Sequence, residues 1–142
     1  MKPLINPYRL VMVVSGGRDC PERHRTKKEF WRYLRSCAKA RGIKKKSEVL
    51  VLVGCARGVD KYIREFCKDN DIPYKVFRAN WKRYKRRAGR IRNQEMADYV
   101  YRPTNAFFMY DGQSPGTTHM REEVVPQLGI PNCTIYYDPI EE

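Results

Sequence analysis

The chain has 142 residues, 42% of them hydrophobic, with 29 Lys and Arg against 16 Asp and Glu, a net charge of +13. This length suits a single domain over residues 1–142, and no apolar run reaches the roughly 20 residues of a membrane span. The first residues lack the apolar stretch of a signal peptide, and five cysteines without a C-x-x-C pair stand beside only two histidines. We therefore expect a cytoplasmic protein with free thiols, no metal site and no membrane contact.

The charge is distributed unevenly along the chain. Residues 1–102 carry 28 basic and 10 acidic residues, a net charge of +18, whereas residues 103–142 have a net charge of −5. Such an asymmetry indicates an anionic partner for the first part of the chain. It does not mark a domain boundary, because one alternation of elements continues through both parts.

Five apolar runs have the length of strands. They lie at residues 9–15, 48–53, 74–77, 106–110 and 133–137. Runs that are apolar on both faces are typical of parallel strands covered by helices on both sides.

Helical patterns separate these runs. Thr26 stands three residues before a glutamate, a capping-box spacing that predicts a helix start, and Gly42 suits the position after the end of that helix. The second helix must end before Pro73, a third is expected at 89–101, and Pro126 must bend or shorten the fourth. The alternation predicts an α/β fold: a single doubly wound, Rossmann-like domain with a mainly parallel five-stranded sheet.

Three glycine-containing loops follow strands, at 15–19, 54–60 and 111–118. Ligands of such sheets bind at the carboxyl ends of the strands, where these loops are expected to meet. Glycine lets the backbone approach a ligand, and the last two loops lead into helix starts that favour phosphate. Arg18 and Arg57 can add bidentate contacts. Connections from strand to helix need glycine in any case, but three loops on one edge predict an anion site.

The motifs of the chain resemble those of the YspA, cpYpsA-related SLOG family, part of a superfamily with DNA-processing protein A and the Lonely-guy phosphoribohydrolases. In order, they are GGRD at 16–19, ARGxD at 56–60, WxxY at 81–84, AGxIRN at 88–93, MAD at 96–98 and DGxSxGTxHM at 111–120. The resemblance covers residues 9–137 of the chain. Members of this family are often encoded by bacteria and their phages.

This resemblance implies a Rossmann-like fold, a pocket for a nucleotide or nucleotide-derived ligand, and a homodimer. The candidate ligand-binding residues are Gly16, Gly17, Arg18, Gly54, Arg57, Gly58, Trp81, Arg92, Asn93, Asp111, Gly116 and Thr117. Asp60 is interpreted either as a helix-start residue or as a ligand contact. No cofactor is predicted.

The hydrolase branch of the superfamily has a catalytic glutamate three residues after the threonine of its Gly-Thr pair. Met120 occupies that place here, and Glu123 is the nearest substitute. His119 has no identifiable partner in the sequence, and Cys55 is interpreted as a packed thiol. We therefore predict a binding protein that senses, stores or sequesters its ligand, with no catalytic residue assigned; the alternative is a nucleoside-monophosphate phosphoribohydrolase or related N-glycosidase.

Two basic segments allow more than one interpretation. In the segment 78–92, Trp81 and Tyr84 alternate with basic residues. We interpret this segment first as a wall of the ligand pocket, second as a solvated basic face, and third as a surface for single-stranded nucleic acid. A nucleic-acid-binding module is accordingly the third functional alternative, and weak, non-specific binding is expected at low salt. The lysine run at 44–46 is interpreted as a solvated turn.

Overall fold

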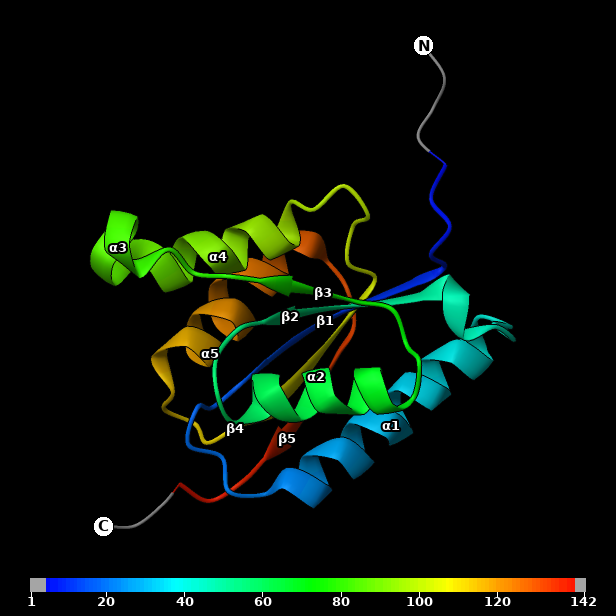
Figure 1. The fold of residues 1–142 in the computed structure, drawn as a ribbon, viewed down its shortest axis with the longest axis horizontal. Helices are drawn as coiled ribbons and strands as arrows, with labels where there is room; N and C mark the ends of the chain where they lie inside the picture. Colours follow the sequence, from blue (N-terminus) through cyan, green and yellow to red (C-terminus); the bar gives the residue numbers. More distant parts are fainter. Residues whose placement is uncertain (1–4, 140–142) are drawn as a thin grey trace.

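The computed structural model describes residues 5–139, which form a five-stranded sheet in the order β3-β2-β1-β4-β5 (Figure 1). Its strands are β1 (Leu10–Gly16), β2 (Val49–Gly54), β3 (Tyr74–Phe77), β4 (Asn105–Tyr110) and β5 (Asn132–Tyr136). Every neighbouring pair is parallel. The predicted α/β class and all five predicted strands are therefore confirmed, with ends that differ by one residue at most.

Helices cover both faces of the sheet. They are α1 (Arg23–Ala40), α2 (Val59–Asp69), α3 (Trp81–Tyr84), α4 (Ala88–Ala97) and α5 (Pro115–His119). Short 3₁₀ turns lie at Lys46–Glu48, Lys85–Arg87 and Val125–Leu128, and a π-helical turn at Met120–Val124 follows α5. Figure 1 shows α1 and α2 on one face and α4 and α5 on the other.

The alternation of side chains along the central strands divides the core into two layers. In β1, Met12 and Val14 pack toward α1 and α2, around Phe30 and Ile63. The intervening residues, such as Val13, pack toward α4 and the helical segment after β4. Because both layers exclude water, the central strands carry apolar residues on both faces, which is why their runs are continuous in the sequence.

The first helix differs from the prediction at its start and agrees with it at its end. It begins at Arg23 rather than Thr26, because the Thr26 hydroxyl is buried and donates a 2.7 Å hydrogen bond to the Glu22 carbonyl instead of capping the helix. Gly42, at φ +66°, is the left-handed residue after the end. The amide of Ile43 reaches back five residues to the carbonyl of Ala38, which completes a Schellman motif.

The third and fourth helices are shorter or less regular than expected. The one predicted at 89–101 is α4, which ends at Ala97, because Tyr99 turns inward and packs edge to face on Phe77. The helix α3 was not predicted from the sequence. In the fourth, Pro126 removes a backbone donor, and the helix after α5 passes through a π turn and a 3₁₀ turn before ending at Gly129.

The strand order creates one place where a ligand site is expected. From the central β1, the chain builds outward through β2 and β3, then returns to the other side of β1 for β4 and β5. The connections at the carboxyl ends of β1 and β4 therefore diverge, and such a divergence leaves a crevice between them. Within residues 5–139, no helix is long and apolar enough to cross a bilayer.

Candidate functional site

A pocket of about 400 Å³ lies at the carboxyl ends of β1 and β4. Seven of the predicted ligand-binding residues line it: Gly16, Arg18, Trp81, Arg92, Asn93, Gly116 and Thr117. They come from the end of β1 and the loop after it, from α3, from α4 and from the start of α5. The pocket is of the size that holds a small molecule.

The other five predicted residues, Gly17, Gly54, Arg57, Gly58 and Asp111, lie behind or beside the lining. Gly58 has φ +72° and touches the backbone carbonyls of Gly17 and Arg18, so any side chain would separate two loops. The amide of Val59 donates to the Gly17 carbonyl at 3.2 Å and locks the same contact. These glycines therefore bring the loops after β1 and β2 together.

Gly54 and Gly116 differ from one another in what surrounds them. A β-carbon at Gly54 would lie 2.5 Å from the Asp60 carboxylate and from Arg92 Nη1, which places both charged groups against this glycine. A β-carbon at Gly116 would meet nothing within 4 Å. Gly116 is thus the predicted glycine whose exposed Cα faces open space on the pocket wall.

Arg57 and Asp111 organise loops. Arg57 forms a 2.8 Å ion pair with Asp19, and both side chains are about 70% exposed at the pocket's edge. Asp111 accepts hydrogen bonds from the amides of Gln113 and Ser114 and from the Ser114 hydroxyl. Burial alone would raise the pKa of Asp111, but these three hydrogen bonds outweigh it and lower the pKa.

The pocket concentrates arginine. Arg18, Arg86, Arg90 and Arg92 line it, against the carboxylates of Asp19 and Asp60. Arg90 has an exposed partner outside the lining, Glu123, at 3.7 Å. Within residues 5–139, Arg18, Arg86 and Arg92 have no carboxylate within 4 Å.

The unpaired arginines occupy distinct parts of the wall. The Arg18 guanidinium stacks over the Trp81 ring, 5.2 Å from its centroid. Trp81 is 46% exposed, so part of its surface stays accessible. Arg92 lies deeper, and its Nε is buried with no hydrogen-bond partner among the described residues. The Nε–H donor of Arg92 is therefore unused among the described residues.

Asp60 is the buried carboxylate of the pocket, with 5% of its surface exposed. Its Oδ2 accepts the Ala56 amide at 3.2 Å. Burial raises its pKa to about 6, against the opposing influence of Arg92, the Ala56 amide, Arg64 and Arg18. Asp60 therefore holds the turn that precedes α2, and it also lines the pocket.

Asn93 and His119 are joined across the pocket wall. Asn93 is 2% exposed, and its Nδ2 donates to the Gly116 carbonyl at 3.2 Å and lies 3.0 Å from His119 Nδ1. Because an amide nitrogen can only donate, Nδ1 of His119 accepts and the proton of the neutral ring sits on Nε2. Burial and the neighbouring Arg90 lower the pKa of His119.

Met120, at the position where the resemblance would place a catalytic glutamate, does not line the pocket. Met120 is fully buried in the core layer under α4. Glu123, the nearest substitute in sequence, is exposed and paired with Arg90. Among the described residues, Asp19 and Asp60 are the carboxylates that the pocket wall offers.

Several lining residues were not among the predicted ones. They are Ser15, Asp19, Ala56, Asp60, Arg86, Gly89, Arg90, Ser114, Pro115 and His119. Four of them directly adjoin a predicted residue along the chain: Ser15, Asp19, Ala56 and Pro115. Arg86 and Arg90 belong to the basic segment expected to form a wall. His119 carried no local signal, because its partner Asn93 lies on another helix.

Comparisons of the chain with protein-family models, with curated proteins and with solved structures find no match. The function is therefore inferred from the pocket and from the motifs that surround it.

Proposed function

We propose that the protein binds a nucleotide or a nucleotide-derived ligand in the pocket between the carboxyl ends of β1 and β4. The observation that carries the proposal is the grouping of Arg18, Arg86 and Arg92 beside the part-exposed ring of Trp81, where none of the three has a described carboxylate within 4 Å. Guanidinium groups match phosphate oxygens in pairs, and an indole face suits a nucleobase.

Three further features support a phosphorylated ligand. The pocket lies at the point of divergence where α/β sheets bind their ligands. The start of α5 presents the bare Cα of Gly116 to the pocket. The motifs that resemble the SLOG family, at 16–19, 56–60 and 111–120, all contribute lining residues. That family's nucleotide-derived ligands are consistent with the pocket's size and charge.

Isothermal titration calorimetry tests the proposal with a nucleoside, its mono- and diphosphate, and inorganic phosphate. We expect the nucleotides to bind more tightly than either part alone. Arg18→Ala removes one charge-assisted contact and should weaken binding by about 1.5–3 kcal/mol, roughly ten- to a hundredfold. Gly116→Leu should block the pocket with the fold intact, because open space surrounds this Cα.

Arg83→Ala is the matched control, because Arg83 lies on α3 in the same basic segment but does not line the pocket. Its affinity should equal that of the unaltered protein. Unchanged affinity in both Arg18→Ala and Gly116→Leu would contradict the proposed site.

Two alternatives predict different measurements. A phosphoribohydrolase would release free base from nucleoside monophosphates, and Asp60 is the buried carboxylate that its pocket offers. A nucleic-acid-binding module would hold a single-stranded oligonucleotide at physiological salt. We expect oligonucleotides to bind only at low salt, because a +13 surface attracts polyanions weakly once the charges are screened over about 8 Å.

A further inference from the structure

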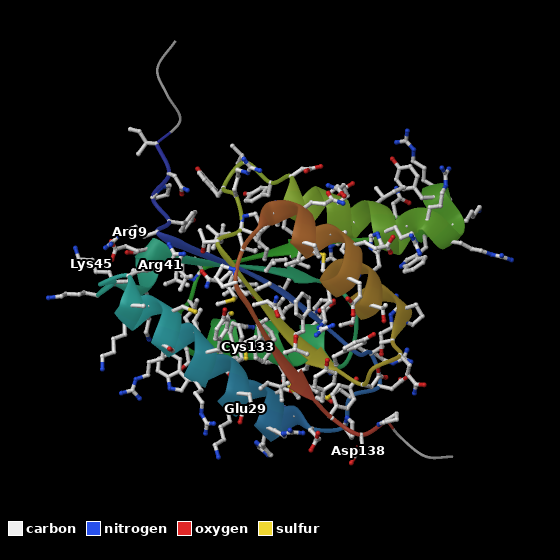
Figure 2. All side chains as sticks on the ribbon, turned by 180° about the vertical axis from the view of Figure 1, so that it is seen from behind. Arg9, Glu29, Arg41, Lys45, Cys133 and Asp138 are labelled. Atoms are coloured by element: carbon white, nitrogen blue, oxygen red, sulfur yellow. The ribbon has the colours of Figure 1, made fainter. Side chains whose placement is uncertain are left out.

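A second pocket, of about 360 Å³, lies at the other end of the sheet, between the carboxyl-terminal half of α1 and the amino ends of β2 and β3. Figure 2 shows Lys45 beyond the end of α1, at the end of the molecule opposite the helices α3 and α4. We call this second pocket the lysine groove. Among the described residues, it shares no lining residue with the pocket at the carboxyl ends of β1 and β4.

The floor of the lysine groove is aliphatic. It consists of Leu34, Ala38, Ile43, Val49 and Ile72, from α1, the turn after it, the start of β2 and the connection before β3. The Schellman motif after α1 fixes Ile43 in place. The floor is therefore preformed, and an apolar group that covers it leaves water without ordering a loop.

One aromatic side chain stands at the edge of this floor. Trp31 is 43% exposed, and its ring packs at a tilt against Phe66, with 5.9 Å between the centroids. A large, held and half-exposed indole beside an apolar floor is typical of an anchor point in a protein interface.

The rim is strongly basic. Arg35, Lys39, Lys44, Lys45 and Lys46 surround the floor, and all five are exposed. In the part of the chain that the structure describes, none of them has a carboxylate within 4 Å. Five like charges around one groove repel each other, and an occupant with several negative charges relieves that repulsion.

We infer that the lysine groove binds an acidic segment of a protein partner, which places aliphatic side chains on the floor and carboxylates against the rim. The aliphatic floor favours this occupant over a nucleic acid, because bases stack on flat rings and, among the described residues, Trp31 alone contributes a ring to the groove. A ligand with a single carboxylate would leave most of the rim unneutralised. The lysine run is in this view part of a docking surface rather than only a solvated turn.

Fluorescence anisotropy with two short labelled peptides tests this inference. One peptide alternates glutamate with leucine, and the other alternates glutamate with serine, so that the two carry the same charge. We expect the leucine peptide to bind about tenfold or more tightly than the serine peptide, and added salt to weaken both. A labelled oligothymidylate serves as the nucleic-acid competitor.

Two variants address the two parts of the groove. Trp31→Ala and the exposed pair Lys44→Glu/Lys45→Glu should each weaken the leucine peptide about tenfold or more. The charge-matched control, Lys82→Glu/Arg87→Glu, lies at the other end of the molecule and should leave the affinity unchanged. Circular dichroism checks that each variant is folded. If Trp31→Ala unfolds, the affinity of Lys44→Glu/Lys45→Glu for the leucine peptide tests the inference.

Each remaining outcome would overturn the inference. Equal binding of the two peptides would reduce the groove to a general basic surface. Tighter binding of oligothymidylate, lost in both groove variants, would make nucleic acid the occupant. Absence of peptide binding at low salt would leave the groove without the proposed partner. The described lining of the pocket at the carboxyl ends of β1 and β4 includes none of these residues. The nucleotide affinities measured there by calorimetry are therefore independent of this peptide-binding test.

Discussion

The buried Asp60 makes the stability of this protein depend on pH in a way that one substitution can isolate. Burial raises the pKa of Asp60 from 3.8 to about 6, and Arg92, the Ala56 amide and Arg64 offset that rise only in part. An acid with a higher pKa in the folded protein holds its proton more tightly there than in the unfolded chain. Protonated Asp60 therefore stabilises the fold below about pH 4, and that stabilisation is lost as the pH rises through about 6.

The size of the effect follows from the two pKa values. A difference of one in pKa corresponds to about 1.4 kcal/mol, so the change from 3.8 to about 6 amounts to about 3 kcal/mol. Asp60→Asn cannot ionise and keeps a carbonyl oxygen for the Ala56 amide. The free energy of unfolding of Asp60→Asn, relative to the unaltered protein, should therefore increase by up to about 3 kcal/mol between pH 4 and pH 7.5.

Urea unfolding of both proteins at pH 4, 5, 6 and 7.5 measures this change. Comparing the two proteins at each pH cancels every other titrating group, and comparing one pH with another cancels the packing effect of the substitution itself. Asp69→Asn, an exposed position on the same helix, controls for the change of chemistry. A gap between Asp60→Asn and the unaltered protein that stays constant with pH would refute the reasoning.

Three further predictions concern the backbone, the core and the pocket wall. Gly58→Ala should lower the free energy of unfolding, measured in urea, by about 2–4 kcal/mol, because φ is +72° and a β-carbon would clash with the backbone of the neighbouring loop. Gly112→Ala, with φ +84° in open space, should lower it by only about 1–2 kcal/mol, and equal losses would contradict the packing argument. Met120→Glu places a carboxylate at a fully buried site and should lower the melting temperature sharply, whereas Met120→Leu should lower the free energy of unfolding by less than about 1.5 kcal/mol. A stable, folded Met120→Glu variant would show that this position can reach solvent. Burial and then Arg90 lower the pKa of His119, so Arg90→Gln should raise that pKa in an NMR titration, and a lower or unchanged value would contradict the assigned charge contact.

The position of the candidate pocket was predictable from the sequence, but the contacts within it were less so. The rule that ligands bind at the carboxyl ends of parallel strands located it, and glycines mark those ends in the sequence. Whether a given glycine faces a ligand or another loop could not be predicted. Gly116 faces open space, whereas Gly58 touches the loop after β1, and this difference depends on how two loops pack.

Contacts between residues far apart in the sequence could not be predicted either, because they too depend on how the elements pack. Asn93 and His119 lie 26 positions apart and meet because α4 and α5 cover the same face of the sheet. Thr26 shows the opposite failure: its spacing from a glutamate suggested a cap, but its hydroxyl is buried one turn inside the helix.

The sequence by itself determined the order of the five strands and of all the helices except α3. Runs that are apolar on both faces require two covering layers, and glycine and proline end elements through local backbone geometry. The tertiary structure alone decided the order β3-β2-β1-β4-β5, and with it which loops border the pocket. That packing decides that, within residues 5–139, Arg18, Arg86 and Arg92 have no carboxylate within 4 Å although they line one pocket beside Trp81. The surroundings of a charge in space, rather than its neighbours along the chain, decide whether it is available to a ligand.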